Sequence, residues 1–162
     1  MTRAVRRVRE EDLPHVVAMV HELAAYERAS EACALSVPAL RAALFGPTPA
    51  LFGHVAVDLT GRAVGVALWF LSFSTWDGVH GVYLEDLFVR PAHRGRGHGR
   101  ALLAALAALC VQRGYSRLAW SVLDWNTPSI EFYRALGARP LDEWVGYRLT
   151  DEALIALAAE DG

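Results

Sequence analysis

The run Val82-Tyr83-Leu84-Glu85-Asp86-Leu87-Phe88-Val89, followed closely by Arg94-Gly95-Arg96-Gly97-His98-Gly99, decides the fold of this chain. The first run is apolar apart from two carboxylates and predicts a strand, and the Ala/Leu-rich stretch from Arg100 to Cys110 predicts a helix. A glycine turn between a strand and a helix exposes backbone N–H groups at the positive end of the helix dipole. Two arginines inside the turn add donors that suit phosphate oxygens. We therefore expect a phosphorylated ligand at this turn.

The spacing of the glycines excludes the two commonest phosphate-binding turns. A Walker P-loop ends in Gly-Lys-Ser/Thr, whereas the last glycine here is followed by Arg100-Ala101. A dinucleotide-binding turn reads GxGxxG and is followed by an acidic residue about 20 positions later. This turn reads GxGxG, and Asp124 lies beyond the next expected strand.

Hydrophobic periodicity and turn residues predict the other elements along the chain. The chain is expected to form a βαβ unit around the glycine turn, with a parallel strand pair and a right-handed crossover. Ser74 to Gly81 is expected to be a loop, and Thr60-Gly61-Arg62 a hairpin turn. The expected strands are Val5 to Val8, Leu51 to Leu59, Ala63 to Phe73, Val82 to Val89, Leu118 to Leu123 and Trp144 to Leu149. The expected helices run from Glu10 to Tyr26, Pro38 to Leu44, Arg100 to near Gly114, Asn126 to before Gly137, and Asp151 to Ala159.

Composition bounds the class of protein. The 162 residues, 54% of them apolar and 21% charged, fit one soluble globular domain. A formal net charge of -2 argues against a nucleic-acid partner bound through a basic field. Cys33 and Cys110 form no CxxC pair, and we expect neither a signal peptide nor a membrane-spanning run. These features predict a cytoplasmic protein without a membrane partner.

The order of motifs resembles the GCN5-related N-acetyltransferase (GNAT) family over almost the whole chain. The order is a strand, Arg-x-x-Gly-x-Gly, a long helix, a strand, Asn126, and a helix that carries Phe132-Tyr133 before Gly137-Ala138. The family hallmark [QR]-x-x-G-x-[GA] is matched by Arg94, Gly97 and Gly99. Three stretches resemble the diamine (spermidine/spermine) branch, which also includes thialysine acetyltransferases. They are Glu22 to Glu27, Tyr83 to Val89 and Trp125 to Tyr133.

The resemblance implies a GNAT-type α/β (α+β) fold in one domain, residues 1–162. We expect a mixed, mostly antiparallel twisted sheet of six to seven strands, with a splayed parallel pair at the cofactor cleft and four to five flanking helices. The implied cofactor is acetyl-CoA, released as CoA, with its pyrophosphate on the glycine turn. The residues implied to bind it are Leu87, Phe88, Val89, Arg94, Gly95, Arg96, Gly97, His98, Gly99, Arg100, Asn126, Ser129 and Tyr133.

The resemblance also implies catalytic roles for two side chains. Tyr133 is expected to protonate the leaving thiolate of CoA, and Glu85 to bind the substrate ammonium and help remove its proton, directly or through water. The backbone N–H of Leu87 is expected to stabilise the oxyanion of a tetrahedral intermediate. No Ser-His pair suggests an acyl-enzyme, so we expect direct transfer in a ternary complex. Asn126 is expected to hold pantetheine, to cap its helix, or to do both.

The acceptor amine is expected to lie among residues from several elements. Adjacent strand residues face opposite ways, so Glu85 and Asp86 cannot both enter the site from a regular strand, although a bulge would relax this limit. Tyr26 and Glu27 are implied acceptor residues or, alternatively, an exposed helix end. The implied substrate-binding residues are Tyr26, Glu27, Glu85, Asp86, Trp120 and Ser121, where Trp120 is alternatively a core residue.

Departures from the polyamine-acetylating relatives favour a short acceptor. Ser74 and Thr75 precede Trp76, where those relatives carry an acidic residue, and fewer carboxylates weaken binding of a multiply charged chain. We therefore expect a small primary amine: thialysine, another lysine-like amino acid or a diamine. A protein or peptide N-acetyltransferase and a non-catalytic acetyl-CoA-binding module remain alternatives. The branch implies a homodimer, and no Cys/His/acid cluster accompanies His93 and His98, so no metal site is expected.

Overall fold

The computed structural model describes residues 4–161 of the chain. The chain divides into two compact units, Met1–Leu123 and Asp124–Gly162, and each is described by itself. The first unit contains the sheet, the glycine turn and most of the expected site residues.

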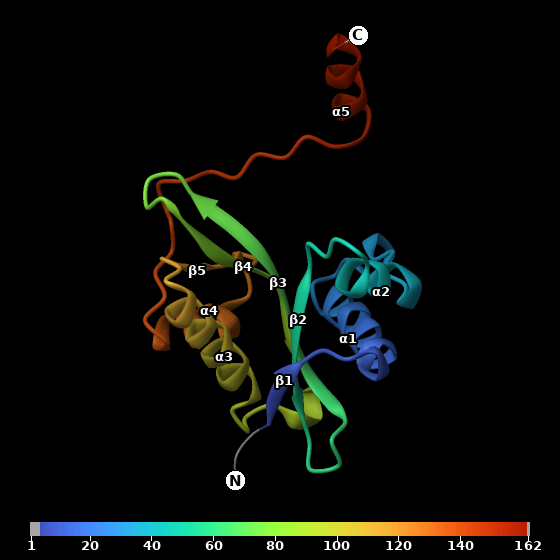
Figure 1. Cartoon of the computed structure of the whole chain (residues 1–162), viewed down its shortest axis with the longest axis vertical. Helices are drawn as coiled ribbons and strands as arrows, with labels where there is room; N and C mark the ends of the chain where they lie inside the picture. Colours follow the sequence, from blue (N-terminus) through green and yellow to red (C-terminus); the bar gives the residue numbers. More distant parts are fainter. Residues whose placement is uncertain (1–3, 162) are drawn as a thin grey trace. The chain divides into compact units, whose positions relative to one another are not determined.

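The first unit is built on one five-stranded sheet in the order β1-β2-β3-β4-β5 (Figure 1). Neighbours from β1 to β4 pair antiparallel, and β4 pairs with β5 in parallel. The expected mixed, mostly antiparallel sheet is therefore confirmed, but the expectation of six to seven strands is wrong for the described chain. The strands are β1 (Val5–Arg7), β2 (Phe52–Val57), β3 (Ala63–Ser74), β4 (Val79–Val89) and β5 (Leu118–Ala119).

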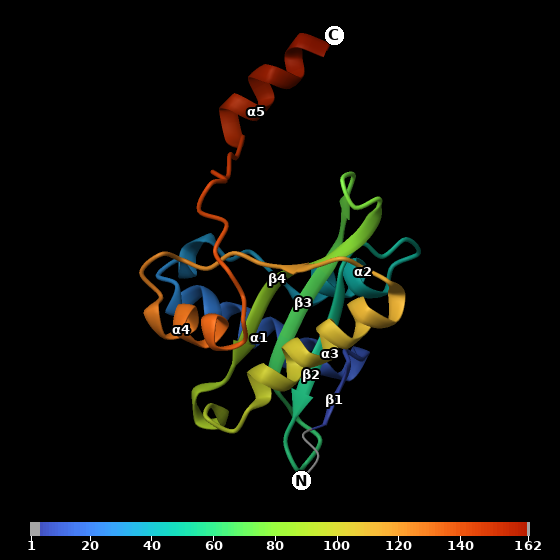
Figure 2. The same ribbon diagram turned by 90° about the vertical axis from the view of Figure 1, so that its left-hand side faces the viewer.

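Helices cover both faces of this sheet. Figures 1 and 2 show α1 (Leu13–Tyr26) and α2 (Val37–Phe45) on one face and α3 (His98–Arg113) on the other. Because successive strand residues face opposite sides, Val55, Val66 and Leu68 enter the core under α1 and α2. The apolar period of α1 supplies Leu13, Val16 and Met19, all fully buried, to the same core.

The opposite face carries a buried polar pair. Trp69 Nε1 donates to His54 Nδ1 at 3.0 Å, and the Trp69 side chain is fully buried. The guanidinium of Arg7 lies 5.0 Å from the centre of the Trp69 ring. Burial, and then the charge of Arg7, lower the pKa of His54 to about 4. His54 is therefore neutral at pH 7 and accepts the indole hydrogen bond.

Two expected strand boundaries differ from the structure by three residues or more. The expected loop Ser74 to Gly81 is a short hairpin turn, and β4 already begins at Val79. Gly81 suggested a break, but it lies inside β4 opposite Ser72. The residue is glycine because Arg117 approaches closely: a Cβ at Gly81 would meet Arg117 O at 3.0 Å. The strand expected over residues 118–123 is shorter, since β5 ends at Ala119.

The second unit contains α4 (Thr127–Ala135) and α5 (Asp151–Ala158). Residues 144–149, expected as a strand, form no regular element, because an apolar alternating pattern makes a strand only where a partner strand pairs with it. The described chain thus has five α-helices, in agreement with the expected four to five. No helix among residues 4–161 has the length and apolarity needed to cross a bilayer.

Candidate active site

The glycine turn is built as a backbone donor site. Gly95 and Gly97 have φ angles of 71° and 79°, in the left-handed region that glycine adopts at little cost. Gly97 is the N-cap of α3, and the hydrogen bond from the N–H of Ala101 to Gly97 O, at 3.0 Å, begins the helical ladder. The N–H groups of the first helical turn precede that ladder and point out of the N-terminus. The turn therefore offers N–H donors, the helix dipole and the charges of Arg96 and Arg100 to an anion.

The strand before the turn has a long edge beyond its parallel partner. β4 and β5 pair only through Val82 with Leu118 and Tyr83 with Ala119, whereas β4 continues to Val89. The expected parallel pair is therefore confirmed, over two residue pairs. Within the described residues, no strand pairs with this edge of β4 beyond Tyr83, which includes the backbone of residues 87–89.

A bulge in β4 places its two carboxylates. Leu68 of β3 is opposite Asp86, and the next residue, Trp69, is opposite Leu84. Glu85 is thus the extra residue, and the alternation of side chains changes phase there. The Asp86 side chain follows Leu68 to the α1 face, and Glu85 is exposed. The bulge relaxes the limit that a regular strand would set on these two side chains.

Three carboxylates share this part of the first unit. Burial, then the negative charge of Glu85 and that of Glu27, raise the pKa of Asp86 to about 6. Burial also raises the pKa of Glu27. The structure therefore brings together Glu27, Glu85 and Asp86, three of the expected acceptor residues, in surroundings that favour a bound cation.

The C-terminal end of α1 is fixed by its own hydrogen bonds. The N–H of Ala29 donates to Ala24 O at 2.8 Å, and that of Arg28 donates to Ala25 O at 3.1 Å. Arg28 has a φ of 61°, so this end is a Schellman motif with arginine in the position that usually holds glycine. The motif sets the direction in which Tyr26 and Glu27 leave the helix.

Arg94, the first residue of the glycine motif, contacts both β4 and α1. Its Nε donates to Val89 O at 2.8 Å. Its guanidinium carbon lies 5.3 Å from the centre of the Phe88 ring and 5.6 Å from that of Tyr26. Phe88 is buried in the core, whereas Tyr26 is 42% exposed. The structure thus brings Arg94, Phe88, Val89 and Tyr26 into one cluster.

Ser121 lies just beyond the end of β5. Its Oγ is 3.0 Å from the hydroxyl oxygen of Tyr83, and both side chains belong to the first unit. This contact joins β4 to the segment after β5 at the point where the two strands separate. Trp120, the neighbour of Ser121, is half-buried.

The remaining expected residues belong to the second unit. Asn126 caps α4, and its Oδ1 accepts from the N–H of Ser129 at 3.4 Å. The expectation that this asparagine is an N-cap is therefore confirmed. Tyr133 lies on the same helix, with its ring centre 5.5 Å from that of Phe132.

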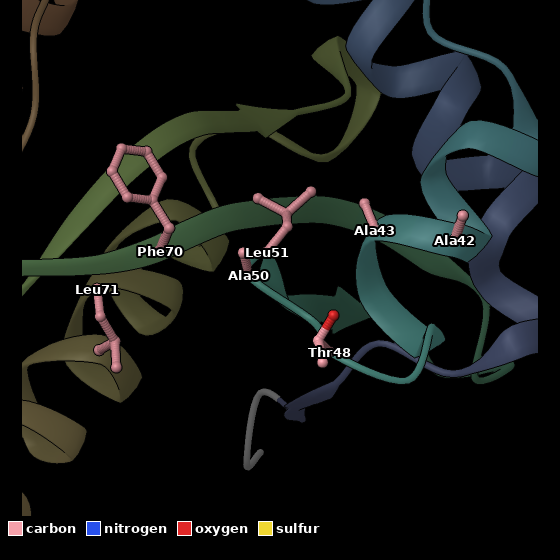
Figure 3. A pocket seen from close by; sticks show the side chains of 7 residues that line it. All are labelled: Ala42, Ala43, Thr48, Ala50, Leu51, Phe70 and Leu71. Atoms are coloured by element: carbon pink, nitrogen blue, oxygen red, sulfur yellow. The ribbon is translucent and has the colours of Figure 1, made fainter.

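A separate apolar pocket of about 490 Å³ lies between α2 and β3 (Figure 3). None of the expected site residues lines it. Its lining side chains are those of Ala42, Ala43, Thr48, Ala50, Leu51, Phe70 and Leu71.

Comparison with known protein families identifies the class to which this arrangement belongs. Residues 5–138 match the model of the acetyltransferase (GNAT) family. The chain belongs to the GNAT family. It is 37% identical to a thialysine N-epsilon-acetyltransferase of Bos taurus, over 96% of this chain and 97% of that protein. It is 40% identical to an L-ornithine N5-acetyltransferase of Arabidopsis thaliana, over 57% of this chain and 41% of that protein.

A solved structure shows the same GNAT fold. An integron cassette protein of Vibrio cholerae superposes with a TM-score of 0.81, covering 98% of both chains at 26% identity. The expected resemblance to the diamine and thialysine branch of the GNAT family is confirmed by the near-full-length similarity to thialysine acetyltransferases. The expected class of enzyme, an N-acetyltransferase, is confirmed by the same relatives and the family match.

Sequence reasoning missed two side chains of this GNAT site. Arg90 Nε donates to Glu22 Oε1 at 3.2 Å, a second link between α1 and the segment before the turn. Tyr83 holds Ser121, as described above. The Arg90 link had no local signal in the sequence, because it joins two residues that are 68 positions apart.

Proposed function

We propose that this chain transfers the acetyl group of acetyl-CoA to a primary amine of a small molecule. The acceptor class that we propose is thialysine, a related lysine-like amino acid or a short diamine. The observation that carries the proposal is the near-full-length similarity to thialysine N-epsilon-acetyltransferases. The carboxylates of β4 and α1 support it, because they suit a cationic acceptor.

The glycine turn fits the pyrophosphate of acetyl-CoA. The left-handed φ angles of Gly95 and Gly97 bend the chain so that the N–H groups of the first turn of α3 face one site. Arg96 and Arg100 add positive charge, and the backbone of β4 beyond Tyr83 offers donors and acceptors to the pantetheine amides. Acetyl-CoA supplies the acetyl group and a thiol leaving group. We propose that Asn126 and Ser129 of α4 also bind the cofactor.

On the acceptor side, we propose that Glu85 and Asp86 hold the ammonium group and take up its proton. An amine reaches the enzyme protonated at neutral pH and cannot attack until the proton has left. The pKa of Asp86 is raised to about 6, closer to neutral pH than that of an ordinary carboxylate. A general base works best when its pKa lies near the working pH, so this shift suits Asp86 to accept the proton. Tyr26, Glu27, Trp120 and Ser121 complete the proposed acceptor site.

We propose that two groups act on the thioester of acetyl-CoA, one as a hydrogen-bond donor and one as a proton donor. The backbone N–H of Leu87 is the proposed donor to the carbonyl oxygen on which negative charge develops. The Tyr133 hydroxyl is the proposed general acid for the leaving thiolate, a transfer that depends on its position because a phenol has a pKa of about 10. Transfer is then direct, without an acylated side chain.

Turnover on a panel of acceptors tests the proposed function. CoA release is measured with thialysine, lysine, ornithine, short diamines, spermidine and a lysine-containing peptide. We expect the highest kcat/KM with a short primary amine and a lower value with spermidine. Preference for the peptide would establish the alternative class of acceptor. Acetyl-CoA binding without CoA release for any amine would overturn the proposal that this chain acetylates amines.

Substitution of Tyr133 by phenylalanine tests the proposed general acid. We expect kcat to fall by about 10²-fold, since a positioned acid contributes on this order, while the affinity for acetyl-CoA measured by calorimetry stays within about twofold. Tyr115→Phe is the matched control, because Tyr115 packs against His80 and belongs to no part of the proposed site. Unchanged turnover in Tyr133→Phe would remove this residue from its role.

A further inference from the structure

Two arginines join the last turns of α1 to the segment that leads into the glycine turn. Arg90 forms an ion pair with Glu22 at 3.2 Å, and the Arg94 guanidinium lies 5.6 Å from the centre of the Tyr26 ring. Glu22 and Tyr26 lie on the same face of α1, one turn apart. The end of this helix therefore contacts the turn-forming segment at two successive points.

Arg94 contributes the more rigid of these two links. Its Nε–H is fixed on Val89 O at 2.8 Å, and the guanidinium also lies 5.3 Å from the centre of the Phe88 ring. Phe88 is 5% exposed and belongs to the core under α1. A planar guanidinium stacks on aromatic faces, so these contacts set the place of the Tyr26 ring relative to β4. The Glu22 carboxylate is 41% exposed, and such an ion pair contributes less.

The residue after Tyr26 faces the acceptor side. Glu27 adds to the negative charge that Asp86 experiences, so the two carboxylates are neighbours. The Schellman motif fixes the backbone of residues 26–29 as one turn. A contact that holds Tyr26 in place therefore also holds Glu27 beside Asp86.

We propose that Arg94 is a positioning residue for the amine acceptor: it holds Tyr26 against β4 and thereby keeps Glu27 at the acceptor carboxylates. This inference rests on the proposed amine acetyltransferase function. It differs from the role in cofactor binding that the family resemblance implies for Arg94, because the contacts of this guanidinium lead to α1. The two roles predict different kinetic effects of the same substitution.

Steady-state kinetics of Arg94→Gln distinguish the two roles. Loss of the stacked cation should raise KM for the amine about five- to tenfold, and change KM for acetyl-CoA by less than about twofold. Arg94→Lys keeps a cation without the planar fork and should give an intermediate KM for the amine. Arg96→Gln is the matched control, since it removes a charge inside the turn and should raise KM for acetyl-CoA instead. The reverse pattern in Arg94→Gln would overturn the proposal.

Substitutions of Tyr26 test whether Arg94 acts through this ring. Tyr26→Leu removes the aromatic face and should reproduce the rise in KM for the amine expected for Arg94→Gln, whereas Tyr26→Phe keeps that face and should give a smaller rise. The double variant Arg94→Gln/Tyr26→Leu should be no worse than either single variant, because both remove the same contact. Additive effects on kcat/KM for the amine would overturn the link.

Hydrogen exchange tests the link without any turnover. The amides of Glu27, Arg28 and Ala29 close the end of α1 and should exchange faster in Arg94→Gln than in the wild type. The amide of Leu40 in α2, bonded to Ser36 O at 2.9 Å, should be unaffected and serves as control. Unchanged exchange at the end of α1 would overturn the link even in an active enzyme. If exchange rises as expected while no amine is acetylated, the link stands and the proposed function fails.

Discussion

At the scale of single residues, Asp86 shows how a bulge in a strand changes the pKa of a side chain. The bulge at Glu85 turns Asp86 toward α1, where burial and two neighbouring carboxylates raise its pKa to about 6. The sequence identified the carboxylate pair and allowed for a bulge. It did not indicate that Glu27, from a distant segment, would act on Asp86, because that depends on where α1 ends in space.

This pKa predicts the pH dependence of acceptor binding. Below pH 6 the Asp86 carboxylate is protonated and no longer pairs with an ammonium group. We therefore expect kcat/KM for the amine to show a break near pH 6, in addition to the slope that ionisation of the amine itself produces. Glu27→Gln should move the break to lower pH, since it removes a negative neighbour. The measurement is kcat/KM for the amine from pH 5 to 8 at saturating acetyl-CoA.

Asp86→Asn should abolish this break and lower kcat/KM at pH 7.5 by at least about tenfold, because the ammonium group loses its charged partner. Arg41→Gln, on the exposed face of α2, is a suitable control for a change of surface charge. A break near pH 6 that persists in Asp86→Asn would assign the titration to another group.

At the scale of elements, β2 and β3 are joined by the buried hydrogen bond between His54 and Trp69. The folded pKa of His54, about 4, lies below its unfolded value of about 6.5. Between these values the unfolded state binds more protons, so the contribution of His54 to stability is full above pH 6.5 and is lost as pH falls toward 4.

His54→Gln should remove this pH dependence, because glutamine can accept the indole hydrogen bond and does not titrate. Between pH 7 and 4.5 the wild type should lose about 2–3 kcal/mol more unfolding free energy than His54→Gln, from the size of the shift. The measurement is urea unfolding at both pH values. Equal losses in the two proteins would show that His54 is already protonated in the fold.

The ends of the helices were easier to predict from the sequence than the ends of the strands. The helices were predicted to within two or three residues, because caps and apolar periods are local signals. The positions at which β4 begins and β5 ends depend on pairing with distant residues, and were wrong. The expected strand Trp144 to Leu149 has the right pattern, but no strand in the described chain pairs with it.

At the scale of the whole molecule, the second unit exposes many large apolar side chains. Such surfaces on a water-soluble domain mark interaction sites. We propose that this segment forms the interface of a homodimer, as the family branch implies. The exposed side chains are those of Leu141, Trp144, Val145, Tyr147, Leu149, Leu154, Ile155 and Leu157, between 46% and 95% exposed.

Light scattering of the purified chain tests this assembly. We expect twice the chain mass of 17.8 kDa for the wild type and a shift toward monomer for Val145→Asp, because a buried charge opposes association. Leu59→Asp is the matched control, since Leu59 is 91% exposed in a hairpin turn of the first unit. A wild type that is monomeric at micromolar concentration would overturn the dimer.

The bulge in β4 also makes Glu85 an inserted residue, which the strand can lose without turning Asp86 to the other face. Glu85→Ala removes a carboxylate and keeps Asp86 facing α1, and deletion of Glu85 gives a regular strand in which Leu84 and Asp86 are adjacent and still face opposite sides. A related chain that is one residue shorter here would therefore still present its acidic residue to the α1 layer of the sheet. When such chains are aligned, a single gap in β4 therefore belongs at Glu85, so that their remaining carboxylate is compared with Asp86.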